Sequence, residues 1–165
     1  MAKRPKVDFL AILDALRARG VDYIVVGGVS GVLHGAPITT FDLDVVHSRA
    51  SENIDRLIQA LGDLDAFSRV QAERRLRPDR SHLESPGHQL LMTRFGPLDL
   101  LGAVGEGRDY DDLMPHAVDI PVGANSIKVI DLDTLIELKE RAGRDKDAAT
   151  LAILRRTRDE RSKGR

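Results

Sequence analysis

Apolar residues along the chain recur at two spacings, which divide the sequence into predicted helices and strands. Phe9, Ile12, Leu13 and Leu16 repeat at the spacing of one helix face, and Gly20 follows as a stop signal. Similar patterns predict further helices over 29–33, 51–61, 131–139 and 145–158, with a helical turn over 110–114.

Short apolar runs with β-branched residues predict strands over 21–26, 39–46, 89–94, 97–101, 117–121 and 126–130. The third and fourth flank Phe95 and Gly96, and the last two flank a turn at 123–125, as expected for hairpins. Residues 65–80 are expected to hold a strand and an exposed loop, and 102–107 a flexible loop. Because helices mix with antiparallel hairpins, the predicted fold class is α+β.

Composition limits the function classes. At 165 residues, 42% hydrophobic and 31% charged, we expect a single domain over 1–165, with a C-terminal helical segment from about 131. A net charge of −1 gives no global case for nucleic-acid binding. The absence of cysteine excludes disulfides, thiolate metal sites and cysteine nucleophiles, and fits a cytoplasmic protein. No apolar run reaches the roughly 18 residues that span a bilayer, so no membrane partner is expected.

A glycine pair, Gly27 and Gly28, ends the first predicted strand. Glycine between a strand and a helix lets the backbone approach a phosphate closely. The alternative is a tight turn that needs only a positive φ. A dinucleotide fingerprint does not fit, because Val26 stands where its first glycine belongs.

Two acids, Asp42 and Asp44, alternate with apolar residues in the second predicted strand. Phe41, Leu43 and Val45 predict a buried face, so the two carboxylates project from the other face. Neighbouring carboxylates repel each other unless a cation lies between them. A divalent metal site and a solvent-facing strand edge are both compatible with this pattern.

Asp99 lies at the centre of the apolar run 97–101. If this strand pairs beside the strand that carries Asp42 and Asp44, three carboxylates converge. Three oxygen donors suit two Mg²⁺ ions, one activating an attacking hydroxyl and one holding leaving phosphates.

These residues, in this order, resemble the signature of the DNA polymerase β-like nucleotidyltransferase superfamily. The similarity is closer to minimal bacterial members, which are related to AbiEii toxins. It is carried by the strings at 26–35 (Val-Gly-Gly-Val-Ser-Gly-Val-Leu-His-Gly), 41–46 (Phe-Asp-Leu-Asp-Val-Val), 96–101, 135–139 and 141–147. The resemblance covers about 21–155.

The resemblance implies a polymerase β-like fold, with a small mixed or antiparallel sheet flanked by helices. It also implies that Asp42 and Asp44 bind both Mg²⁺ ions, and that Asp99 completes the site and helps to activate the acceptor hydroxyl.

The substrate implied by the resemblance is a nucleoside triphosphate such as ATP. Gly27, Gly28 and Ser30 would bind it, and Lys139 would contact its triphosphate or help to hold the acceptor. Residues 37–40 lack the basic residue that many relatives carry, so we expect triphosphate contacts to rely on the backbone and Lys139.

The implied activity is Mg²⁺-dependent transfer of a nucleoside monophosphate to a hydroxyl of tRNA, a protein or a small molecule. The closest resemblance also implies the toxin half of a toxin–antitoxin pair, with an antitoxin as partner. The alternative is a catalytically weak copy of the fold that senses nucleotides or binds a partner.

Two further groups of charged residues have open interpretations. The arginines at 69, 74, 75, 77 and 80 could hold an RNA backbone or a triphosphate, or form a solvated loop face. Lys146 and Asp147 could orient the last helix against the core, or form an exposed pair at its start.

Overall fold

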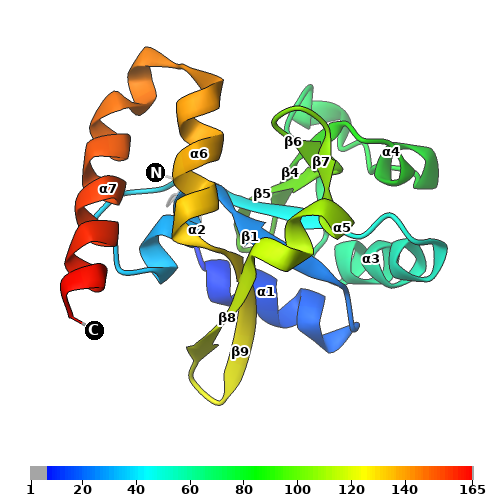
Figure 1. The fold of residues 1–165 in the computed structure, drawn as a ribbon. Coiled ribbons are helices and arrows are strands. Elements are labelled where there is room, and N and C mark those ends of the chain that lie inside the picture. The colour runs from blue at the N-terminus through cyan, green and yellow to red at the C-terminus, as the bar shows by residue number, and fades with distance from the viewer. Residues whose placement is uncertain (1–6, 165) are drawn as a thin grey trace, which may run out of the picture.

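A seven-stranded mixed sheet forms the centre of the structure, a computed structural model that describes residues 7–164 (Figure 1). The strands are β1 (Tyr23–Val26), β2 (Leu43–His47), β3 (Phe67–Ser68), β4 (His88–Thr93), β5 (Gly96–Leu101), β8 (Ala117–Val122) and β9 (Asn125–Ile130). Their order is β3-β4-β5-β2-β1-β9-β8. The β2–β5 and β1–β9 pairs are parallel and the other neighbours are antiparallel.

Helices cover both faces of this sheet. They are α1 (Phe9–Ala18), α2 (Gly27–Leu33), α3 (Ser51–Asp63), α4 (Arg80–Glu84), α5 (Tyr110–Leu113), α6 (Leu132–Ala142) and α7 (Ala148–Lys163), with 3₁₀ turns η1 (Ala72–Arg74), η2 (Met114–His116) and η3 (Asp145–Asp147). Figure 1 shows α6 and α7 side by side on one side of the sheet, with α1 on the other. The predicted α+β class is confirmed.

Two apolar clusters occupy the two faces. Leu16 of α1 and Leu57 of α3 belong to the cluster that contains Val45 of β2. Leu135 of α6 belongs to the cluster that contains Val46 of β2. Because side chains alternate along a strand, Asp44 lies on the same face as Val46, the face that α6 and α7 cover.

The predicted strand over 39–46 is too long. β2 begins at Leu43, and residues 41 and 42 form a bend before it. Phe41 is 76% exposed, so the expectation that it shares the buried face of Leu43 and Val45 is wrong. The approach to β2 is fixed instead by Thr40, whose hydroxyl donates a hydrogen bond of 3.2 Å to the Asp42 carbonyl.

Other segments also differ from the prediction, and α4 was not predicted at all. The helix expected from residue 29 begins at Gly27, so the glycine pair forms its first turn. The segment 102–107, expected to be a flexible loop, contains β6 (Ala103–Val104), which pairs with β7 (Arg108–Asp109) as a separate two-stranded sheet. The last helix continues to Lys163, beyond its expected end near 158. Among the residues described, no helix has the length and apolar character needed to cross a bilayer.

Candidate active site

The end of β1 meets the start of β2 at the glycine pair. Gly27 has φ +65°, and a Cβ at this position would lie 2.3 Å from Asp44 Oδ2. A Cβ at Gly28 would lie 2.6 Å from Thr40 Oγ1. A side chain at residue 27 would be strained by the positive φ and would overlap Asp44, and one at residue 28 would displace Thr40. The two glycines therefore bring the backbone of α2 against the Asp44 carboxylate.

Ser30 supports this turn from within α2. It is fully buried, and its hydroxyl donates a hydrogen bond of 2.5 Å to the Gly27 carbonyl. In the structure Ser30 therefore holds the glycine turn in place, and its predicted contact with a nucleotide stays a prediction.

Asp44 and Asp99 are direct partners across the parallel β2–β5 ladder. The two strands therefore pair, which was the condition for their carboxylates to meet, and both carboxyls lie on the face toward α6. Burial, and then the charge and hydrogen bonding of Asp99, raise the pKa of Asp44 to about 7. A pair of buried carboxylates that resists double ionisation is a site where a cation would relieve the repulsion.

Asp42 lies outside the ladder, in the bend before β2. Its charge also contributes to the raised pKa of Asp44, so the three predicted acids share one neighbourhood. Within residues 7–164, however, no group of three or more histidine or acidic side chains is arranged to hold a metal ion. The two-carboxylate pair is therefore the part of the predicted trio that the fold assembles directly.

Asp99 has a second partner that the sequence did not single out. Arg69 Nη2 donates a hydrogen bond of 2.6 Å to Asp99 Oδ1, and Arg69 Nη1 donates one of 2.5 Å to the Leu91 carbonyl. Arg69 follows β3 at the edge of the sheet, so its side chain reaches across β4 to β5. The sequence could not have separated it from the other arginines nearby.

Lys139, on α6, is held near the pair by Asp147. Lys139 Nζ lies 3.9 Å from Asp147 Oδ1, and Arg144 Nε lies 2.9 Å from Asp147 Oδ2. The positive charge of Lys139 acts against the other influences and lowers the pKa of Asp44. Asp147 is 7% exposed, so the alternative of an exposed pair at the helix start is wrong for this residue.

A cavity of about 200 Å³ opens beside these groups. Its polar boundary consists of Gly27, Gly28, Asp44, Lys139 and Arg144, and its apolar boundary of Val26, Leu101, Val104, Gly105, Leu135, Leu138 and Ala142. Arg144 was not predicted as a site residue, although it lies in the 141–147 string. The cavity combines exposed backbone, two cations and a carboxylate, which are the groups that bind a phosphate and its counter-ion.

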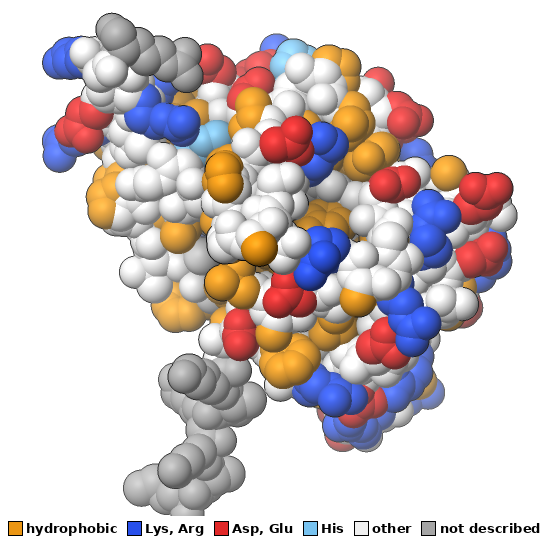
Figure 2. All heavy atoms as spheres, turned by 90° about the horizontal axis from the view of Figure 1, so that it is seen from below, with side chains coloured by type: hydrophobic (Ala, Val, Ile, Leu, Met, Phe, Trp, Pro, Cys, Tyr) orange, Lys and Arg blue, Asp and Glu red, His pale blue; other side chains and the backbone are white. Residues whose placement is uncertain are grey.

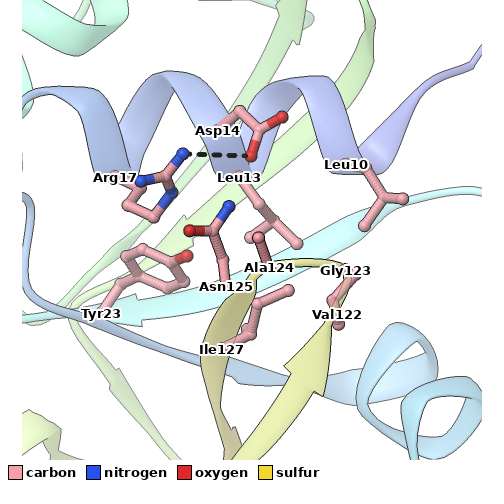
Figure 3. A pocket seen from close by; sticks show the side chains of 10 residues that line it. All are labelled: Leu10, Leu13, Asp14, Arg17, Tyr23, Val122, Gly123, Ala124, Asn125 and Ile127. Carbon is pink, nitrogen blue, oxygen red and sulfur yellow. Dashed lines mark ion pairs between the residues drawn. The ribbon is translucent and has the colours of Figure 1, made fainter.

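Another hollow, of about 260 Å³, lies between α1 and the β8–β9 turn (Figure 3). Its charged residues, Arg17 and Asp14, face each other at 3.9 Å and are both largely exposed. It reaches β1 at Tyr23, at the other end of that strand from Val26, the ladder partner of Asp44. This hollow lacks the combination of a carboxylate and two cations beside a glycine turn, which lines the cavity at Gly27.

Most arginines of residues 74–80 are engaged in ion pairs. Arg75 and Arg77 both contact Asp65, and Arg80 contacts Asp55 and Glu84. On the face shown in Figure 2, Lys and Arg side chains likewise lie beside Asp and Glu side chains. These contacts favour a solvated loop face over a surface that binds RNA.

Comparison with known proteins supports the fold. Scans of protein-family models and of curated proteins gave no match. A solved structure of a Thermotoga maritima protein assigned as a nucleotidyltransferase matches with a TM-score of 0.59 and 18% identity, over 87% of this chain and 90% of that chain. The lincosamide antibiotic adenylyltransferase LnuA, solved with lincomycin bound, matches with a TM-score of 0.61 and 16% identity, over 91% and 98%. The chain therefore has the nucleotidyltransferase fold.

Proposed function

We propose that this protein is a nucleotidyltransferase, which transfers a nucleoside monophosphate from a nucleoside triphosphate to a hydroxyl acceptor. One observation carries the proposal: Asp44 and Asp99 face each other beside a cavity bounded by the glycine pair, Lys139 and Arg144. A structural ion-pair network has no need for two buried acids in direct register. The fold shared with an adenylyltransferase is consistent with this chemistry.

The donor set fits a divalent cation such as Mg²⁺. Asp44 and Asp99 supply carboxylate oxygens, and burial together with the charge of Asp99 raises the pKa of Asp44, so a bound cation would favour its ionised form. Asp42 would complete the set for two ions. When bound, Mg²⁺ would neutralise phosphate charge and acidify the acceptor hydroxyl.

The remaining groups have roles that follow from their positions. Lys139 and Arg144 would bind the triphosphate, and the backbone at Gly27 and Gly28 would approach it without side-chain obstruction. The acceptor oxygen would bond to the α-phosphorus as the bond to the bridging oxygen breaks and pyrophosphate leaves. The hydroxyl proton would pass to the Asp99 carboxylate. Positioning and charge neutralisation provide most of such catalysis.

We further propose a small molecule as the acceptor. The cavity has apolar walls at Leu101, Val104 and Leu138, and the arginines over 74–80 are engaged with acids. LnuA, whose structure holds lincomycin, offers a parallel for a small acceptor. tRNA or protein as acceptor, and a toxin role with an antitoxin partner, are the outcomes that would replace this part of the proposal.

A catalytically inert nucleotide-sensing module is the second candidate. It is favoured by one observation, that residues 7–164 contain no assembled group of three metal-binding side chains. Such a module would bind nucleoside triphosphate without consuming it.

The test is transfer of label from each α-³²P nucleoside triphosphate, with Mg²⁺ or Mn²⁺, to small hydroxyl compounds, tRNA and protein. We expect transfer to a small molecule that Asp44→Asn and Asp99→Asn each reduce at least about 100-fold. Asp119→Asn, which removes an exposed acid of β8 that pairs with Lys128 of β9, is the matched control and should retain activity. Transfer that survives Asp44→Asn would exclude the proposed chemistry, and nucleotide binding without any transfer would favour the sensing module.

A further inference from the structure

Arg69 and Asp99 form the most buried arginine–carboxylate pair within residues 7–164, with side chains 24% and 12% exposed. The Arg69 guanidinium is fixed twice, by the Asp99 carboxylate and by the Leu91 carbonyl. Its own backbone N–H donates a hydrogen bond of 2.8 Å to the Leu90 carbonyl. The group is thus held firmly by β4 and directed at the acid of β5.

This contact changes the charge of the candidate site. Asp44 and Asp99 alone would present two negative charges to a cation, and Arg69 compensates one of them. It also occupies Asp99 Oδ1, while the Asp99 carboxyl lies within hydrogen-bonding reach of Asp44. Free divalent cations are therefore attracted less strongly than two unpaired carboxylates would attract them.

We propose that Arg69 is a positioning residue that acts through Asp99. It fixes the orientation of the Asp99 carboxylate for the acceptor hydroxyl, and it weakens binding of a free cation so that the cation enters together with the nucleotide. This inference rests on the proposed nucleotidyl transfer. It assigns a role to one arginine of the 69–80 group and leaves the others at the surface, most of them in ion pairs.

The chain offers a matched control at Arg77. Arg77 also bonds one backbone carbonyl, that of Ala66 at 3.1 Å, and one carboxylate, that of Asp65. Its side chain is 54% exposed, and its partner Asp65 is not part of the Asp44–Asp99 pair. Arg77→Gln therefore removes the same kinds of contact as Arg69→Gln without touching the Asp44–Asp99 pair.

The first measurement is Mn²⁺ affinity of the full chain without nucleotide, by electron paramagnetic resonance. Arg69→Gln should bind free Mn²⁺ about tenfold more tightly than wild type, because a positive charge is removed from the pair. Arg69→Lys should stay within about twofold, because the charge is kept. Arg77→Gln should match wild type. Weaker or unchanged Mn²⁺ binding by Arg69→Gln overturns the proposal, because loss of an arginine with only a structural role would leave the Mn²⁺ affinity unchanged or lower it.

The second measurement separates kcat from KM for the nucleotide. Both Arg69 variants should lower kcat about tenfold with KM within about twofold of wild type, because an ammonium or amide group cannot bridge Leu91 and Asp99 as the guanidinium does. A wild-type kcat in Arg69→Lys overturns the positioning role even if Arg69→Gln folds poorly. Wild-type protein that binds no Mn²⁺ and transfers no label overturns the proposed function together with this inference. If wild type binds Mn²⁺ and transfers label, and Arg69→Gln has the same Mn²⁺ affinity and kcat as wild type, only this inference is overturned.

Discussion

Gly27 and Asp44 approach each other so closely that a single methyl group between them would overlap the carboxylate. The distance from a Cβ at residue 27 to Asp44 Oδ2 would be 2.3 Å, and the backbone there has φ +65°. The glycine is thus tied to the acid by sterics as well as by its backbone conformation. Glycine at position 27 is therefore needed because of its contact with Asp44, and not only because the turn has a positive φ.

Gly27→Ala should abolish detectable transfer and lower the free energy of unfolding by about 2 kcal/mol or more, through positive-φ strain and overlap with Asp44. Gly123→Ala is the matched control, because Gly123 has φ +61° and a Cβ there would meet nothing within 4 Å. Urea unfolding and the transfer assay measure both effects. Equal loss of activity in the two variants would contradict the steric link to Asp44.

The raised pKa of Asp44 predicts how the metal-free protein responds to pH. Asp44 releases its proton near pH 7 in the folded state, whereas in the unfolded chain it does so near the ordinary value of about 4. The folded state therefore binds more protons between these values. The contribution of Asp44 to the free energy of unfolding is therefore fully present below about pH 4 and is lost as the pH rises through about 7.

In EDTA, the free energy of unfolding of wild type should fall about 2 kcal/mol more between pH 5 and pH 8 than that of Asp44→Asn. The asparagine variant cannot ionise at this position, so its free energy of unfolding lacks this part of the pH dependence. Urea titrations at the two pH values provide the comparison. Parallel behaviour of the two proteins would show that Asp44 is not protonated in the folded state near neutrality.

Divalent cations should stabilise the folded protein through the same pair. Mn²⁺ at about 100 times its dissociation constant should add about 2.7 kcal/mol to the free energy of unfolding of wild type. Asp44→Asn and Asp99→Asn should lose most of this gain, and removing Mn²⁺ with EDTA should reverse it. Asp119→Asn should keep the full gain, and a cation effect that is equal in all four proteins would place the ion elsewhere.

Asp147 should matter for nucleotide binding although it does not line the cavity. Its carboxylate holds Arg144 at 2.9 Å and lies 3.9 Å from Lys139. Asp147→Asn removes the charge that orients both cations, so KM for the nucleoside triphosphate should rise about tenfold.

Asp145→Asn is the matched control for this experiment, because Asp145 lies in the same turn η3 and is exposed. Steady-state kinetics at fixed acceptor concentration give KM for both variants. If Asp147→Asn lowers only stability and leaves KM unchanged, Asp147 serves the start of α7 and not the cavity.

The sequence allowed the central relationship of the site to be predicted because it depends on strand periodicity. Asp44 and Asp99 each interrupt an apolar run, and the two acids meet because the strands that carry them are neighbours in the sheet. The class of fold followed from the same patterns. The roles of these acids in metal binding and catalysis remain predictions.

Other features depend on tertiary contacts that no local pattern records. Phe41 continues the apolar alternation of β2, yet the chain bends before Leu43 and leaves Phe41 at the surface. Arg69 resembles its neighbouring arginines in sequence, and only the order β3-β4-β5 brings it within reach of Asp99. The sequence offers Asp147 as a possible organiser of the last helix, but its contacts with Lys139 and Arg144 depend on the fold of the turn between α6 and α7.

β2 lies in the middle of the sheet, between β1 and β5, whereas β8 lies at its edge. Backbone amides of β2 should be among the slowest to exchange with deuterium, because they open only when the chain unfolds as a whole. The β8–β9 turn lies at the margin of the sheet, where insertions should be accepted without loss of solubility or transfer. Engineering of this protein should therefore begin at that turn and leave the middle strands unchanged.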